Sequence, residues 1–67
     1  MKMLDVVIIK DRRKYDSKIT IEEFDEILKD KDFYLISKGL VDFYDGTATL
    51  YEFNYKKECR IFIWDNR

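Results

Sequence analysis

Only one stretch of this chain carries the signals of a helix, and this limits what else the chain can build. Thr20 is a good N-cap, and Glu23 stands three residues later, at the spacing of a reciprocal capping box. Acidic residues fill the first turns and Lys29 lies near the end, which suits the helix dipole. Apolar side chains follow at helical spacing: Ile21, Phe24, Ile27 and Leu28. These cues predict one helix over residues 20–31.

The remaining regular segments have the composition of strands. Residues 3–9 are β-branched and almost continuously apolar, which predicts a strand that is central or covered rather than a solvated edge. Asp45-Gly46 between two β-rich runs predicts a hairpin. Gly39 is either a turn or a bulge within one long strand, and the sequence leaves both open. Apolar residues in segment 10–18 recur neither at helical spacing nor at the alternate positions of a strand, which predicts a connecting loop.

Together these segments predict an α+β fold. We expect a single small domain over residues 1–67, because the chain has no Pro and only two Gly, too few for a flexible linker. The expected architecture is an antiparallel-rich sheet of four or five strands in β-α-β-β-β order, with the helix packed on one face.

The overall charge and the apolar runs exclude several classes of protein. Thirteen Lys and Arg against fourteen Asp and Glu leave a net charge of -1. The molecule as a whole is therefore neither a basic protein that binds polyanions nor an acidic mimic of nucleic acid. No apolar run approaches the ~18 residues of a membrane span. Asp5 comes too early for the apolar segment of a secretory signal peptide to form before it. The single Cys forms no internal disulfide. We therefore expect a cytoplasmic protein.

The residues that usually carry catalysis are scarce. The chain has no His, the common general base near neutral pH. Cys59 alternates with Ile61 and Ile63, a pattern more typical of a small core residue than of a nucleophile. One Cys without His makes no zinc site, and there is no glycine-rich phosphate loop. We expect no enzyme, no metal and no cofactor.

The aromatic residues gather in the second half of the chain, and one helix covers only one side of a sheet. A large apolar patch left in water is unusual for a monomer, so a partner should cover the other side. The alternative is a tightly curled sheet that buries the aromatic side chains of both of its faces. Such curling needs more Gly residues or bulges than the sequence shows. The contact anchors are expected among these side chains: Tyr44, Tyr51, Phe53, Tyr55, Phe62 and Trp64.

Charge is unevenly distributed along the chain. Residues 10–18 carry five basic and two acidic side chains, whereas residues 22–32 carry six acidic and two basic ones. Such complementary patches steer and orient a partner. The side chains expected to do so are Arg12, Arg13, Glu22, Glu23 and Glu26.

These observations predict a non-catalytic protein-binding module, a small regulator or inhibitor that contacts another protein or a second copy of itself. Its composition, rich in Lys, Asp, Ile, Tyr and Phe, is typical of small proteins of AT-rich genomes and their viruses. The alternative is single-stranded nucleic-acid binding, in which a basic loop contacts phosphates and aromatic rings stack on bases. Its residues would be Arg12, Arg13, Lys14 and Tyr15, with the aromatic sheet face beside them.

Overall fold

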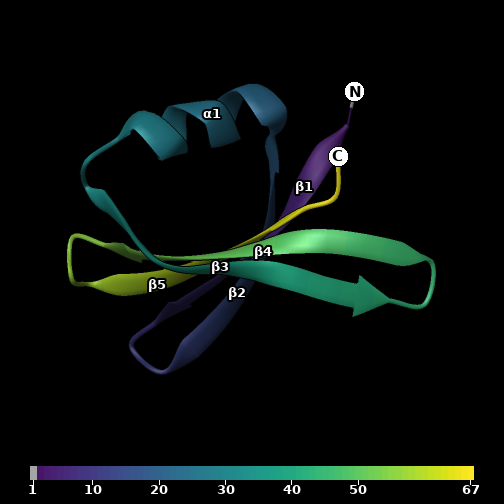
Figure 1. The fold of residues 1–67 in the computed structure, drawn as a ribbon. Coiled ribbons are helices and arrows are strands. Elements are labelled where there is room, and N and C mark those ends of the chain that lie inside the picture. The colour runs from purple at the N-terminus through teal and green to yellow at the C-terminus, as the bar shows by residue number, and fades with distance from the viewer. Residues whose placement is uncertain (1) are drawn as a thin grey trace.

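The computed structural model describes residues 2–67, which form five strands and one helix. All neighbouring strands are antiparallel, in the order β2-β1-β5-β4-β3 (Figure 1). The expected α+β fold with one antiparallel sheet and one helix is confirmed. The elements along the chain are β1 (Met3–Lys10), β2 (Arg13–Thr20), α1 (Ile21–Lys29), β3 (Phe33–Phe43), β4 (Gly46–Tyr55) and β5 (Cys59–Asp65).

The loop predicted over residues 10–18 is wrong, because most of it belongs to β2. Asp11 and Arg12 make a two-residue turn with φ of 53° and 64°, and β2 then pairs along the whole of β1. The element order is therefore β-β-α-β-β-β rather than β-α-β-β-β. β2 lies at an edge of the sheet, where charged side chains are tolerated on both faces. Its sequence consequently lacks the apolar alternation of an interior strand.

The hairpin predicted around Asp45-Gly46 exists, but its turn is one residue earlier than expected. Phe43 pairs with Gly46, so Tyr44 and Asp45 form the loop and Gly46 opens β4 with φ of 149°. Gly39 lies within β3 and makes no turn. The register shift in this strand falls between Leu35 and Ser37, so the irregularity is near Ile36 and not at Gly39.

The helix begins where the capping residues predicted. Thr20 Oγ1 accepts from the Glu23 N–H at 3.1 Å, and Glu23 Oε1 accepts from the Thr20 N–H at 2.8 Å. The helix ends at Lys29, two residues before the predicted boundary. Asp30 ends it: its Oδ1 accepts from the Asp32 N–H at 2.9 Å, and its carbonyl accepts from the Phe33 N–H at 3.1 Å. These bonds turn the chain toward β3.

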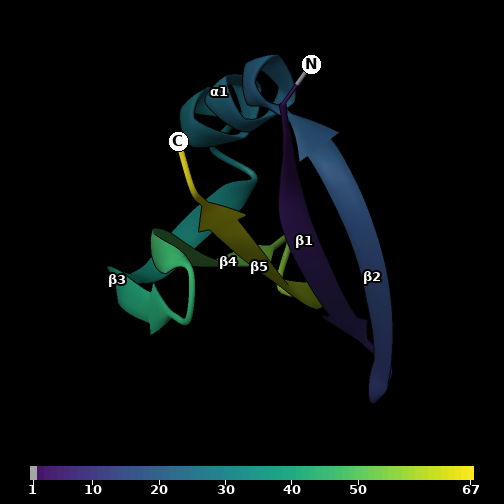
Figure 2. The ribbon, with the colours of Figure 1, turned by 90° about the vertical axis from the view of Figure 1, so that its right-hand side faces the viewer.

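The core lies between α1 and the face of the sheet that curves beneath it (Figure 2). Phe24 is the buried residue of α1, and its ring meets Tyr51 edge-on with centroids 5.0 Å apart. Buried side chains from the three interior strands complete this layer: Leu4, Val6, Tyr51, Phe53, Ile61 and Ile63. Within the described chain, β2 and β3 are the two edges, so the sheet stays open and does not bury both of its faces.

Candidate functional site

The sheet face that points away from α1 is not covered by another element of the described chain, and we call it the open face. Strand alternation and the pairing register decide which side chains lie on it. Its apolar members come from four adjacent strands: Met3, Val7, Ile9, Tyr34, Val41, Phe43, Ala48, Leu50, Phe62 and Trp64. The open face therefore carries an apolar band that crosses most of the sheet.

Two aromatic rings of β5 form the centre of this band. Trp64 stands opposite Asp5 of β1 and Leu50 of β4, and Phe62 stands opposite Val7. The two ring centroids are 6.5 Å apart and the planes are tilted by 35°. Both side chains are half-buried, so each keeps apolar surface that a partner could cover.

Charged side chains on the open face are paired with one another. On the β1–β2 side, Lys18 lies 3.6 Å from Asp5. Towards β3, Arg60 lies 3.3 Å from Glu52, which also accepts a 3.2 Å hydrogen bond from the Ser37 hydroxyl. Salt-bridged side chains therefore lie directly beside the aromatic pair, with Asp5 opposite Trp64 and Glu52 opposite Phe62.

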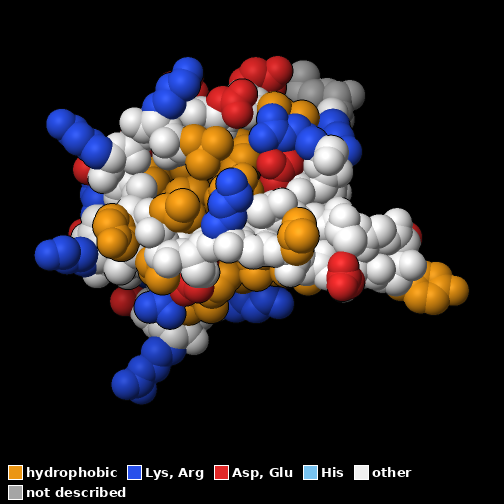
Figure 3. All heavy atoms as spheres, in the orientation of Figure 1, with side chains coloured by type: hydrophobic (Ala, Val, Ile, Leu, Met, Phe, Trp, Pro, Cys, Tyr) orange, Lys and Arg blue, Asp and Glu red, His pale blue; other side chains and the backbone are white. Residues whose placement is uncertain are grey.

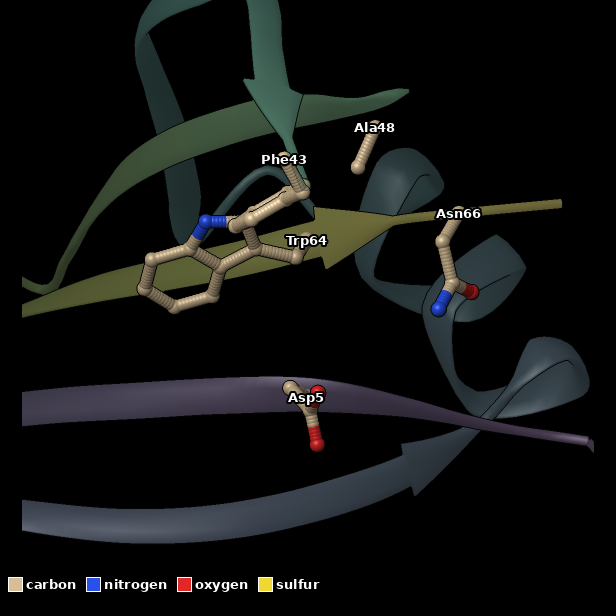
Figure 4. A pocket seen from close by; sticks show the side chains of 5 residues that line it. All are labelled: Asp5, Phe43, Ala48, Trp64 and Asn66. Carbon is tan, nitrogen blue, oxygen red and sulfur yellow. The ribbon is translucent and has the colours of Figure 1, made fainter. Parts of the chain in front are cut away.

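A hollow of about 380 Å³ is lined by residues of all four strands of this band. Trp64 and Phe43 converge on it from β5 and β3, and Asp5 lies on the neighbouring β1 (Figure 4). Ala48, only 4% exposed, and Asn66 complete the lining. The hollow combines apolar walls with one carboxylate, so it suits an apolar side chain next to a hydrogen-bond donor.

A second hollow of about 470 Å³ was not expected from the sequence. It is lined by Lys31, Asp32, Tyr34, Asn54, Lys56 and Lys57. Asn54 Oδ1 is buried there and accepts no hydrogen bond from the described chain. Lys56 and Lys57 reach this place through a turn in which both have positive φ, 52° and 60°. The sequence predicts a solvated turn over residues 54–58, whereas in the structure Asn54 and Tyr55 still belong to β4 and the turn is residues 56–58.

The structure divides the predicted aromatic anchors among three places. Tyr51 and Phe53 face α1 and are only 9% and 2% exposed, so they belong to the core. Tyr55 lies on the same face, half-buried, with its ring centroid 4.5 Å from that of Phe33. Phe62 and Trp64 lie together on the open face. The fully exposed Tyr44 is in the β3–β4 turn, whose tip projects from the body of the molecule (Figure 3).

The predicted charged residues do not form one surface. Arg12 lies in the β1–β2 turn, with Arg13, Lys14 and Tyr15 in the strand that follows. Lys14 is 3.8 Å from Asp16, so one of the basic side chains has an acidic partner. The acidic residues Glu22, Glu23 and Glu26 lie on α1, at the opposite end of the molecule from that turn (Figure 2).

Arg67 makes a set of contacts that the sequence did not predict. Its guanidinium donates two 2.9 Å hydrogen bonds to the Asp65 carboxylate, lies 5.6 Å from the centre of the Phe24 ring and is 3.9 Å from Asp25. The hydrogen bonds from Arg67 lower the pKa of Asp65. These contacts tie the end of β5 to α1.

Among residues 2–67, no helix is long and apolar enough to cross a membrane. No three carboxylate or thiol side chains of the described chain gather closely enough to hold a metal ion. Comparison of this chain with models of protein families, with curated proteins and with solved structures finds no match.

Proposed function

We propose that the protein is a non-catalytic binding module that contacts another protein through its open face, as a small regulator or inhibitor. The observation that carries this proposal is the half-buried Phe62–Trp64 pair beside the hollow at Ala48, on a sheet face that no other element of residues 2–67 covers. Trp and Tyr are the residue types that most often anchor a protein interface, and they do so from well-packed positions.

The lining of the hollow supports a particular chemistry for the proposed partner. Trp64, Phe43 and Ala48 offer apolar contact, which suits an aliphatic or aromatic side chain. Asp5 is paired with Lys18 across 3.6 Å while most of its carboxylate surface stays exposed, so a second donor can still reach it. The fitting partner is therefore a protein that presents an apolar side chain next to a basic or amide group.

The test compares two aromatic truncations on opposite faces. Trp64→Ala removes the wall of the hollow, whereas Tyr15→Ala removes an exposed ring on the other face of the sheet and serves as the matched control. A partner captured with a photo-crosslinker on the open face is purified and titrated against both variants by calorimetry. We expect Trp64→Ala to weaken binding by about 30-fold or more, corresponding to a hot spot of about 2 kcal/mol, and Tyr15→Ala to leave it unchanged.

Two results would overturn the proposal. One is equal affinity of the wild type and Trp64→Ala for the purified partner, provided that the circular dichroism spectrum shows both to be folded. The other is tight binding to a mixed-sequence single strand that is lost on raising salt from about 50 to about 200 mM and on replacing Arg12 and Arg13 by Ala. That result would favour the nucleic-acid function of the β1–β2 turn.

A further inference from the structure

The two edges of the sheet differ in how well they are protected against another strand. β2 carries charges at four of its eight positions, including Lys14 and Lys18, which is how edge strands commonly avoid pairing. In β3, the regular part from residue 37 to 43 has only Lys38 and Asp42 as charges, and Leu40 between them is 80% exposed. β3 is thus the edge that is open to pairing.

The β3–β4 register shows which backbone groups of β3 are free. Phe43 and Gly46 flank a two-residue loop, so they form a hydrogen-bonded pair. Because such pairs alternate along an antiparallel ladder, Val41 and Gly39 also direct their N–H and C=O groups toward β4. Lys38, Leu40 and Asp42 therefore direct theirs toward the unpaired edge. The hairpin that holds them extends beyond the rest of the sheet (Figure 1).

The order of side chains along this edge is self-complementary. When two copies of β3 run antiparallel about a two-fold axis at Leu40, Lys38 of each copy stands opposite Asp42 of the other. The two Leu40 side chains meet between these ion pairs and cover each other. The ammonium of Lys38 lies 5.3 Å from the centre of the Tyr51 ring, an exposed contact that leaves it able to meet a carboxylate.

Neighbouring registers lack this match. A two-fold axis at Lys38 or at Asp42 places like charges directly opposite each other, which is unfavourable. An axis at Gly39 or at Val41 places Leu40 opposite a charged side chain and leaves the other charge without its partner. Only the register centred on Leu40 satisfies both charges and the exposed Leu together.

We propose that the protein forms a homodimer through antiparallel pairing of β3 with β3, centred on Leu40. Three pairs of residues then exchange about six backbone hydrogen bonds, and the two sheets become one of ten strands. The two-fold axis is perpendicular to the sheet, so both helices lie on one side and both open faces on the other. This inference goes beyond the proposed function and does not rest on it, because β3 pairs through its edge and not through the open face.

The test is sedimentation equilibrium on the full chain and on charge-reversed variants. An interface of this small size fits a dissociation constant of about 1–100 μM, so concentrations span that range. Lys38→Asp and Asp42→Lys each place like charges opposite one another and should raise the dissociation constant by about tenfold or more. The double variant Lys38→Asp/Asp42→Lys restores opposite charges and should return it to within about twofold of the wild type.

The matched control is Lys14→Asp, which reverses a charge on the other edge strand and should leave the dissociation constant unchanged. Thermal unfolding of every variant shows whether the fold survives. The double variant also lacks the Lys38–Tyr51 contact, so a return of its dissociation constant to the wild-type value reports charge matching alone. A wild type that stays monomeric at the highest concentration overturns the proposal. So does a dimer that responds equally to all of the single reversals, or to none of them.

Discussion

Replacing Phe24 by alanine tests how α1 is held to the sheet. Phe24 is fully buried and is the buried residue that α1 contributes to the core. Removing its ring loses about 1.5–3 kcal/mol of apolar burial and about 0.5–1.5 kcal/mol of edge-to-face contact with Tyr51. The ring is also covered by Arg67, 5.6 Å from its centre. We therefore expect Phe24→Ala to cost about 3–4 kcal/mol, within the range for buried Phe truncations.

The loss is large relative to the stability of so small a domain. A chain of 67 residues is expected to have a free energy of unfolding of about 3–10 kcal/mol, so Phe24→Ala should leave it marginally folded. Urea unfolding followed by circular dichroism at 222 nm measures the change. Leu28→Ala is the control, because Leu28 is on the same helix but exposed and should cost less than about 1 kcal/mol. A Phe24→Ala cost as small as that of the control would refute the packing of α1 described above.

Two further predictions concern the β1–β2 turn and the end of β5. Arg12 has φ of 64°, a conformation unfavourable for a side chain with a Cβ, so Arg12→Gly should raise the free energy of unfolding by about 0.5–1 kcal/mol in urea titrations. The folded pKa of Asp65 lies below its usual 3.8, so its ionised form adds stability above that pH, and this stability is lost as pH falls through the folded pKa. Asp65→Asn should therefore lower the melting temperature at pH 7, and its melting temperature should fall less than that of the wild type on acidification below about pH 4.

The features that the sequence predicted correctly depend on residues close together in the chain. The capping box joins Thr20 to Glu23 within one turn, so local spacing suffices to locate the start of α1. Alternation along a strand likewise puts Phe62 and Trp64 on one face of β5, as the structure has them. Tyr51 and Phe53, which were expected among the same contact anchors, face α1 instead.

What the sequence did not predict depends on non-local pairing. Whether α1 covers the face of Phe53 or the face of Trp64 is decided by the register that sets Ile61 and Ile63 beside the apolar residues of β1, and no short-range pattern encodes that register. β2 was missed because an edge strand buries little and is free to be charged. The register shift in β3 lies near Ile36. From the sequence, Gly39 was the candidate for a turn or a bulge in this segment.

The open face and the β3 edge can be tested independently because their side chains point to opposite sides of the sheet. Lys38, Leu40 and Asp42 project on the α1 side of β3, whereas Trp64 projects from the open face. A dimer paired through β3 would present two copies of the Trp64 hollow on one surface, and a partner that spans both would gain from the high effective concentration of the second site. Lys38→Asp should then weaken binding to such a partner without touching the hollow. Trp64→Ala should weaken binding while leaving the dimer intact, so the two variants separate assembly from recognition.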